Sequence, residues 1–565
     1  MVKTIFVDKK LKIKPNLTDY SKLYKSFEWS KAQKEITLLP NGKINMAFNV
    51  LDEQALGSKK NKIALFWEGE KNESKKFTFF EFYLLANQFG NFLKKLKVKK
   101  GERVFFFLPR IPELYFGFLG TLKIGAVAGT LFPAFGSEAL YDRLKNSGAK
   151  ILITNKELLP RLESISHKLP DLKKIILAEN LGNLLREFSV KLKALPMEPE
   201  DPAFMLYTSA TGNTPVSGIV IPHKAILQQK LTAKWVLDLK DEDTYWCTAD
   251  PGWVTGVVYG LLAPWSLGIS QLIFSGRFTP ERWYELMEKY RISVFYTAPT
   301  ALRMLQVKEK IIKNYDLSSL RHLSTVGEAL PPDIFDWVLK NFKIPAHDTW
   351  WQTETGAMMI VNYPCLPIKP GSMGKPIPGI KAVIVDEKGK ELKDKKEGNL
   401  AFKPNWPAKM NKIWKNEKLY KSYFSHGWYL SGDQAFRDKD GYYWFSGRKS
   451  EIIKTSGERV GTFEVESVLN RYPAVLEAAV IGKPDKLRGE IIKAFVVLKP
   501  TLKPSEILET KLQEYVKSHL AGHAYPREID FVKSLPKNKS GKIMRRLLKN
   551  KELGLPIGDI STLED

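Results

Sequence analysis

The chain has 565 residues, and at roughly 150 residues per domain this length predicts two to four folding units and excludes a disulfide-stapled mini-scaffold. The hydrophobic fraction of 44% and the charged fraction of 27% are ordinary for globular proteins and exclude a disordered chain. The 88 Lys and Arg exceed the 62 Asp and Glu by 26, so a nucleic acid, a membrane surface or an anionic ligand must be considered as a partner.

The positive charge is spread along the chain, as expected of a solvated lysine-rich surface, except that residues 533–551 hold eight Lys or Arg and no acid. Cys247 and Cys365 are not spaced as metal ligands, and the first residues show no apolar run typical of a signal peptide. We therefore expect a cytoplasmic protein without a disulfide framework or a zinc site. The apolar stretch 114–132 contains Lys123 and four glycines, which favours a buried helix running into a strand over a membrane span.

Apolar runs of strand length alternate with helical patterns through the first part of the chain. We expect a helix opened by proline over Pro112–Ile124, and strands over Val104–Leu108, Lys150–Thr154 and Lys174–Ala178. The alternation continues past residue 300, where FSGR and VFYTAPT follow the pattern of strand ends. Such alternation predicts parallel sheets covered by helices.

A loop rich in Gly, Ser and Thr follows the apolar run Phe204–Thr208, which we expect to be a buried strand, and Pro222 is expected to open a helix after it. Such a loop can offer several backbone N–H groups and hydroxyls to one phosphate. The alternative is a flexible connection without a ligand.

Two adjacent tryptophans stand among polar side chains in the segment HDTWWQTETG, residues 347–356. Buried polar groups need partners, so this composition indicates a ligand pocket more than a core strand. The indoles could wall off a planar or apolar group, and Glu354 could hold a magnesium ion on phosphates. The alternative is an aromatic strand end with ordinary caps.

Asp433, in the run WYLSGD, is expected at a strand end, where a carboxylate can accept both hydroxyls of a ribose. An aspartate in a plain turn is the alternative. Further along, Lys542 follows a Ser-Gly turn that could place its ammonium where negative charge develops. The alternative there is a basic surface run that contacts a nucleic acid.

From about Gly447 the pattern changes to shorter elements, which predict a compact α+β unit of roughly 115 residues. We expect a helix, two strands, a second helix and a third strand over Phe463–Tyr472, Ala474–Ile481, Ile491–Leu498, Ser505–Leu520 and Glu528–Val532.

In this order and spacing, the segments resemble the adenylate-forming acyl-CoA synthetases, and within them the acetyl-CoA synthetase branch. The resemblance covers nearly the whole chain, through PRIPELYFGFLGTLKIGAVAG, YWCTADPGWVTG, YTAPTALRML, VGEAL, DTWWQTETG, KPGSMGKPIPG, WYLSGD, GRKSEIIKTSGERVGTFEVES and PKNKSGKIMRR. It implies a large α/β domain of βα-layered subdomains, residues 1–447, and a small mobile α+β domain, residues 448–565. It also implies an acetate–CoA ligase, in which acetate, ATP and CoA give acetyl-CoA, AMP and diphosphate through an acetyl-adenylate, with a domain rotation between the half-reactions.

The resemblance also implies residue roles. Lys542 would bridge the carboxylate and the α-phosphate, and a lysine acetylase, opposed by a deacetylase, would switch the enzyme off at that amine. Glu354 would act in catalysis beside Mg2+. The expected ATP contacts are Thr208, Ser209, Thr211, Gly212, Gly327, Glu328, Ala329, Asp348, Thr349, Trp350, Trp351, Gln352, Thr353, Asp433, Arg448 and Arg459.

The acyl group, CoA, the hinge and a second metal position are implied in the same way. The expected acyl pocket comprises Val254, Thr255, Val326 and Trp351, and a tryptophan at its floor leaves room for a couple of carbons only. Ser456 and Gly457 would approach CoA, Ser450 would be the hinge, and the backbone of Asn470, Tyr472 and Val475 would bind magnesium.

The sequence departs from the family in two places. The phosphate loop, residues 208–218, has Ala210 for a glycine and Val216-Ser217 where a lysine is expected, and Ser450 replaces an acid at the hinge. Two alternatives to the acetate–CoA ligase therefore stay open, namely a short- or medium-chain acyl-CoA synthetase and a catalytically impaired paralogue that binds nucleotide or CoA. A nucleic-acid partner is not expected, because the basic window, residues 533–551, contains the loop that would serve ATP.

Overall fold

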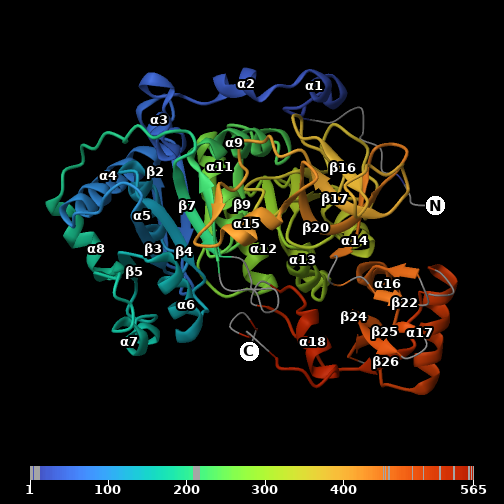
Figure 1. Cartoon of the computed structure of the whole chain (residues 1–565). Coiled ribbons are helices and arrows are strands. Elements are labelled where there is room, and N and C mark those ends of the chain that lie inside the picture. Colours follow the sequence, from blue (N-terminus) through green and yellow to red (C-terminus); the bar gives the residue numbers. More distant parts are fainter. Residues whose placement is uncertain are drawn as a thin grey trace.

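Figure 1 shows the computed structural model of the chain, which describes residues 4, 13–207, 217–448, 451, 453–455, 458–485, 488–500, 502–520, 524–538, 541–557, 560 and 563. Three sheets build a large domain, and a small domain, orange to red in Figure 1, lies beneath its right side. The predicted fold class, a large α/β domain followed by a small α+β domain, is confirmed.

A seven-stranded sheet forms from residues 103–222 and one later strand, and it is parallel at its centre. Helix α5 (Pro112–Lys123) begins at proline and packs against α4 (Phe79–Lys95), so closely that a Cβ on Gly120 would lie 2.5 Å from the carbonyl oxygen of Ala86. In spatial order the strands are β18 (Lys412–Ile413), β8 (Gly218–Pro222), β7 (Pro202–Tyr207), β4 (Val127–Leu131), β3 (Arg103–Phe107), β5 (Ile151–Thr154) and β6 (Lys174–Leu177).

The elements predicted in this region are confirmed within one or two residues. The apolar stretch 114–132 forms most of α5 and then β4, and the buried Lys123 ammonium lies 2.7 Å from the carboxylate of Asp52. In the described part of the chain, no helix combines the length and apolarity that crossing a bilayer requires.

The segment after β7 differs from the prediction. We expected the Gly, Ser and Thr loop to lead into a helix at Pro222, but β7 pairs antiparallel with β8, so the loop joins two strands. Residues 218–222 are apolar throughout and are all buried, which suits a strand covered on both faces. Helix α9 (Ile226–Trp235) begins only after a 3-10 turn, His223–Ala225.

A nine-stranded sheet forms the middle of the large domain, and its strands from β13 to β1 run parallel. The carboxyl ends of these strands therefore meet at one edge, where ligands bind in open α/β sheets. In spatial order the strands are β15 (Lys375–Pro376), β14 (Ile360–Val361), β13 (Ala346–Trp350), β12 (His322–Thr325), β11 (Val294–Thr297), β9 (Thr244–Cys247), β10 (Ser270–Phe274), β1 (Ile63–Glu68) and β2 (Ser74–Thr78).

A third, antiparallel sheet carries Asp433 and corrects its expected position. Asp433 lies within a strand, β20 (Trp428–Arg437), rather than at a strand end. The register between β20 and β17 shifts near this point, and Gly432 has a φ of +77°, so an irregularity inside the strand turns the aspartate toward the site. The other strands are β16 (Ala382–Val385), β17 (Gly398–Phe402), β19 (Phe424–Ser425) and β21 (Tyr443–Arg448).

The small domain is a sheet with helices on both faces, and its predicted elements are confirmed with shifted ends. Along β24 (Val475–Asp485), alternate residues face α16 and α17 on one side and α18 on the other. The remaining elements are β22 (Ile453–Thr455), β23 (Glu458–Val460), β25 (Gly489–Leu498), β26 (Glu528–Phe531), α16 (Thr462–Leu469), α17 (Glu506–His519) and α18 (Arg545–Glu552). Lys542 lies in the loop between β26 and α18.

The N-terminal strap, residues 16–29, binds segments that lie far along the chain (Figure 1, dark blue). The hydroxyl of Tyr20 donates to the carbonyl of Pro376 at 2.9 Å, and the hydroxyl of Tyr24 donates to that of Ile380 at 3.0 Å. The indole of Trp29 donates to the carbonyl of Gly379 at 3.1 Å. The strap therefore joins the beginning of the large domain to the strands of its last third.

Candidate active site

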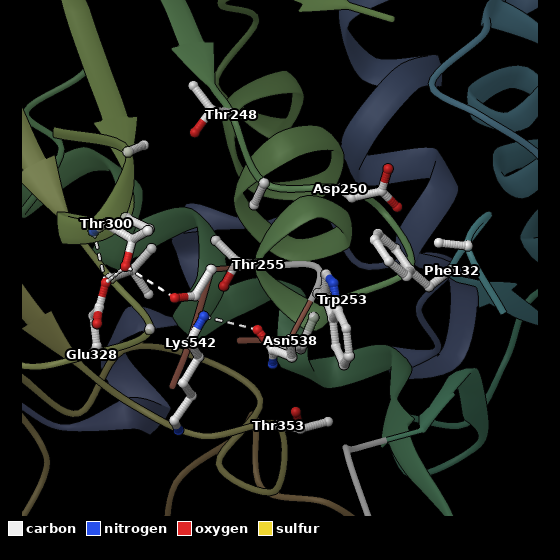
Figure 2. A pocket seen from close by; sticks show the side chains of 18 of the residues that line it. Phe132, Thr248, Asp250, Trp253, Thr255, Thr300, Glu328, Thr353, Asn538 and Lys542 are labelled. Atoms are coloured by element: carbon white, nitrogen blue, oxygen red, sulfur yellow. Dashed lines mark hydrogen bonds between the residues drawn. The ribbon is translucent and has the colours of Figure 1, made fainter. Parts of the chain in front are cut away.

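A cavity of about 1260 Å³ lies where the carboxyl ends of the strands meet the loop before α18. Its wall includes residues at or just after the ends of five neighbouring parallel strands, namely Thr248, Ser275, Thr297, Val326 and Trp351. The small domain contributes Lys537, Asn538, Gly541 and Lys542 (Figure 2). The site is thus built at the strand edge that the fold favours and is closed by the second domain.

The Lys542 loop is held both by its own backbone and by the large domain. The amide of Lys542 donates to Oδ1 of Asn538 at 2.8 Å, which closes the turn (Figure 2). The hydroxyl of Thr300 lies 3.3 Å from the carbonyl oxygen of Gly541 and also bonds to the carboxylate of Glu328. The loop is therefore docked on α13 (Pro299–Gln306), with Lys542 in the cavity wall.

The electrostatic surroundings lower the pKa of the Lys542 ammonium to about 8. The charge of Arg448 is the largest cause, burial is the second, and Glu451 and Asp433 act in the opposite direction. The nearby cations and burial outweigh the two carboxylates and favour the neutral amine, whereas a bound phosphate would favour the charged form. The site is thus charged to receive an anion.

Asp433, Arg448 and Trp350 form one corner of the site. The indole of Trp350 donates to Oδ2 of Asp433 at 3.0 Å, and Nε of Arg448 lies 4.0 Å from Oδ1. Burial raises the pKa of Asp433, while Arg448, Trp350 and Lys542 oppose that rise. The Trp350 ring stacks on Phe402 and does not itself line the cavity, so it holds the carboxylate in place from behind.

Glu354 and Gln352 also line the cavity. The hydroxyl of Tyr423 donates to Oε1 of Glu354 at 3.0 Å, and burial raises the pKa of this carboxyl. The side-chain amide of Gln352 donates to the carbonyl of Ser431 at 2.8 Å and accepts from the hydroxyl of Tyr429 at 2.9 Å. Gln352 is therefore fixed by the third sheet, and Glu354 is a cavity carboxylate in a setting that favours a cation nearby.

All four residues of the expected acyl pocket line the cavity together. Val254 and Thr255 begin the short helix α10 (Val254–Val257), Val326 follows β12, and Trp351 follows β13. A π-helical turn, η6 (Val258–Leu262), continues α10 directly. Single π-turns are common at functional sites, where they change which side chains share a face.

Of the expected nucleotide contacts, Gly327, Glu328, Trp351, Gln352, Thr353, Asp433 and Arg448 line the cavity, as do both expected catalytic residues, Lys542 and Glu354. Asp348 and Thr349 do not line it. They are buried, with Oδ1 of Asp348 accepting from the hydroxyl of Thr325 at 2.8 Å, and they form the layer beneath the wall. Burial raises the pKa of Asp348 to about 7. Ala329 is adjacent to the wall but is not part of it.

Several predicted residues fall outside the described part of the chain, namely Thr208, Ser209, Thr211, Gly212, Ser450, Ser456, Gly457 and the side chain of Arg459. The expected magnesium turn, Asn470, Tyr472 and Val475, lies at the end of α16 and the start of β24, away from the cavity. Among the described residues, no cluster of three or more His, Cys, Asp or Glu side chains could hold a metal ion. Both cysteines are free.

Sequence reasoning missed Thr248, Asp250, Trp253 and Thr300, which line the cavity in Figure 2. The carboxylate of Asp250 lies 3.7 Å from Nε of Arg110 and accepts from the amide of Gly252. The signal was present, because Asp250-Pro251-Gly252-Trp253 leads into Val254 and Thr255, and Thr300 lies in the YTAPTALRML segment.

Comparison with family models agrees with this site. Residues 51–410 match the model described as "AMP-binding enzyme", and residues 464–542 match the model described as "AMP-binding enzyme C-terminal domain". The second match ends at Lys542. The chain therefore belongs to the family of AMP-binding enzymes.

Curated relatives extend over nearly the whole chain. An acetyl-coenzyme A synthetase of Bacillus subtilis is 50% identical, with 97% of this chain and 98% of the relative covered. An acetyl-coenzyme A synthetase of Pyrobaculum aerophilum is 37% identical, with 96% and 89% covered. Within the family, the chain thus falls in the acetyl-CoA synthetase branch that its motifs predicted.

Two solved structures share the fold. A Brucella canis acyl-CoA synthetase matches with a TM-score of 0.74 and 32% identity over 95% of this chain and 99% of that one. An anthranilate CoA ligase in complex with anthranoyl-AMP matches with a TM-score of 0.84 and 32% identity over 92% and 98%.

Proposed function

We propose that this chain is an AMP-forming acetate–CoA ligase in which the cavity binds ATP and acetate and Lys542 acts in adenylation. The observation that carries the proposal is the meeting of Lys542, Asp433 and Arg448 with the expected acyl pocket in a single cavity. Nucleotide, carboxylate and a mobile cation must come together there for an acyl-adenylate to form.

In the first half-reaction, an oxygen of acetate attacks the α-phosphorus of ATP, a P–O bond forms, and the bond to diphosphate breaks. The transition state carries extra negative charge at the α-phosphate, and the Lys542 ammonium stabilises it by proximity. Asp433 would accept the ribose hydroxyls, and Arg448 would contact phosphate or ribose. Gly327 to Ala329, Trp350 to Thr353 and the 208–212 loop would complete the nucleotide site, with Asp348 and Thr349 supporting it and Arg459 nearby.

In the second half-reaction, the CoA thiolate attacks the acetyl carbonyl, a C–S bond forms, and AMP leaves with the electron pair of the C–O bond. We propose that the domain 448–565 turns about Ser450 relative to 1–447, which withdraws Lys542 and brings Ser456 and Gly457 to CoA. The two half-reactions therefore require that the Lys542 loop dock on Thr300 reversibly.

Magnesium fits Glu354. Its carboxylate lines the cavity, is half-buried, and offers the hard oxygen ligand that this ion prefers. When bound, the ion supplies charge neutralisation on the phosphates. The backbone of Asn470, Tyr472 and Val475 would hold a second ion, and Oδ1 of Asn470 at the same turn has no hydrogen-bond partner among the described residues.

We further propose that a lysine acetylase and a deacetylase control Lys542 in the cytoplasm, because acetylation would remove the charge on which adenylation depends. Treatment of the purified enzyme with an acetylase and acetyl-CoA, followed by peptide mass spectrometry, checks this proposal. Loss of activity without acetyl-Lys542 would contradict it.

The test of the function is acetate-dependent ATP–diphosphate exchange, followed by thioester formation with CoA, over acids from acetate to benzoate. We expect acetate first and propionate second. Exchange that is strongest with longer or aryl acids would favour the medium-chain alternative. Binding of ATP without exchange for any acid would favour the impaired paralogue.

Trp351 is the residue on which acyl size depends. Burial of each additional methylene of the acid is worth about 0.8 kcal/mol. The Trp351 indole at the cavity wall occupies the space that a longer acid would need, so longer acids do not obtain this binding energy. Trp351→Gly should therefore shift kcat/KM toward butyrate and longer acids by tenfold or more relative to acetate. An unchanged order of acids in this variant would show that Trp351 does not bound the pocket.

A further inference from the structure

The indole of Trp351 is held from behind by a tyrosine that does not line the cavity. Its Nε1–H donates to the hydroxyl of Tyr296 at 3.3 Å. Tyr296 lies on β11, is fully buried, and is not among the cavity residues. An indole N–H is a donor only, so it needs an acceptor of this kind when it is buried.

The direction of the hydrogen bonds behind Trp351 follows from proton counting. Thr349 has one hydroxyl proton, which it donates to the carbonyl of Thr325 at 2.7 Å. The 2.7 Å bond between Tyr296 and Thr349 must then have Tyr296 as its donor, which leaves the lone pairs of Tyr296 for Trp351. The indole chain, Trp351 to Tyr296 to Thr349 to the Thr325 carbonyl, is satisfied at every step and ends on the backbone of β12.

A second tyrosine contacts Trp351 without joining this chain. The ring of Tyr259, in η6, lies edge to face against the indole at 5.1 Å and 84°. Its hydroxyl accepts from the amide of Met358 at 2.9 Å and lies 2.8 Å from the hydroxyl of Thr232. Tyr259 therefore supports the ring by packing only, whereas Tyr296 supports its orientation.

We propose that Tyr296 is the positioning residue that sets acyl selectivity, because its hydroxyl fixes the Trp351 ring across the end of the pocket. The inference rests on the proposed acetate function. A tryptophan χ2 torsion is broad, so a ring without the anchor can swing and open space for another carbon. Thr349, which lies beneath the cavity wall, would then support the acyl pocket as well as the nucleotide site.

The experiment compares kcat/KM for acetate and propionate in Tyr296→Phe and Tyr259→Phe. Each variant loses one buried hydroxyl that makes two hydrogen bonds, and each keeps its ring. We expect the propionate-to-acetate ratio to rise about fivefold in Tyr296→Phe, about 1 kcal/mol at 1.4 kcal/mol per tenfold change. The ratio should stay within twofold of the wild type in Tyr259→Phe. An unchanged ratio in Tyr296→Phe, or an equal rise in both variants, would overturn the proposal.

A double-mutant cycle tests whether Tyr296 changes acyl selectivity through the Trp351 indole N–H. Phenylalanine at position 351 has no N–H, so adding Tyr296→Phe to Trp351→Phe should change the ratio less than twofold. A further fivefold change in that background would show that Tyr296 acts by another route.

A readout that does not depend on turnover separates this proposal from the proposed function. In NMR spectra of the nitrogen-15-labelled enzyme, the Trp351 indole N–H is identified by its loss in Trp351→Phe. Its exchange with solvent should be faster in Tyr296→Phe than in the wild type or in Tyr259→Phe. A wild type that activates no acid would remove the proposed function, while an unchanged exchange rate would by itself overturn the anchoring role of Tyr296.

Discussion

The Lys542 side chain changes between its charged and neutral forms near pH 8, because its pKa is lowered to about 8. Below that pH the ammonium is present and can stabilise the α-phosphate, and above it the amine is neutral. The value of kcat/KM for ATP–diphosphate exchange should therefore fall as pH rises through about 8, since this ratio reports the free enzyme. The measurement is a pH profile of exchange between pH 6 and 10.

The control for this profile is Lys542→Arg, which stays charged over the whole range and should lack the alkaline limb in whatever activity remains. Lys542→Ala should abolish exchange yet leave thioester formation from supplied acetyl-adenylate largely intact. Equal loss of both half-reactions would remove Lys542 from its assigned step.

Helix α18 carries the Lys542 loop and is fixed to the small domain by a buried ion pair at its first residue. The guanidinium of Arg545 donates to both carboxylate oxygens of Glu466 in α16, at 2.7 and 2.5 Å, and the two side chains are 17% and 5% exposed. Removal of one partner leaves a buried charge without its mate, which costs about 3–5 kcal/mol.

We therefore expect Arg545→Met to lower the thermal midpoint of the small-domain transition and to slow exchange together. Lys549→Met, in the same helix, is the matched control, because the Lys549–Glu490 pair is more exposed and should cost under about 1 kcal/mol. Calorimetry on the full chain makes the comparison. Equal midpoints for the two variants would contradict a structural role for the Arg545 pair.

At the scale of elements, the sequence predicted what periodicity and composition can encode. Five elements of the small domain, α16, β24, β25, α17 and β26, and the α5–β4 pair agree with prediction within a few residues, because alternating and helical apolar patterns specify them directly. The short strands β22 and β23 and the helix α18 were not predicted. The hairpin of β7 and β8 was missed, because the apolar run 218–222 was read together with its proline rather than as a partner for β7. Strand pairing depends on tertiary contacts, so a local sequence pattern does not predict which strands pair.

The residues of the candidate site could also be predicted only in part. The family resemblance grouped Lys542, Glu354, Asp433 and the acyl residues in one site, and all of them line the one cavity. The motifs could not distinguish wall from support in DTWWQTETG, since this segment runs without a change of pattern from the last residues of β13 into the loop that follows. Asp348 and Thr349 point into the buried layer, and Trp351 and Gln352 line the cavity, a difference that depends on how β13 pairs with its neighbours.

The two domains meet through Gly541, where the chain has a φ of +84°. A Cβ at this position would lie 2.4 Å from Cγ2 of Thr300. Gly541→Ala should therefore disfavour the docked loop and slow exchange tenfold or more, while thioester formation from supplied acetyl-adenylate is largely spared. Rapid-quench assays of the separate half-reactions measure this split.

Gly554→Ala is the matched control, because Gly554 also has a positive φ, +64°, but no atom lies within 4 Å of its added Cβ. The backbone strain is shared by both variants, and the clash with Thr300 is present in one only. Equal ratios of the two half-reactions in both variants would show that the contact with Thr300 does not control docking.

The N-terminal strap has a consequence for how the molecule is made. Tyr20 and its partner Pro376 are 356 residues apart. At a synthesis rate of 5–20 residues per second, the strap leaves the ribosome roughly 20 to 70 seconds before the segment that it binds. Tyr20, Tyr24 and Trp29 therefore cannot make their hydrogen bonds to residues 376–380 until most of the large domain has been synthesised. These contacts of Tyr20, Tyr24 and Trp29 are therefore among the last of the large domain to form.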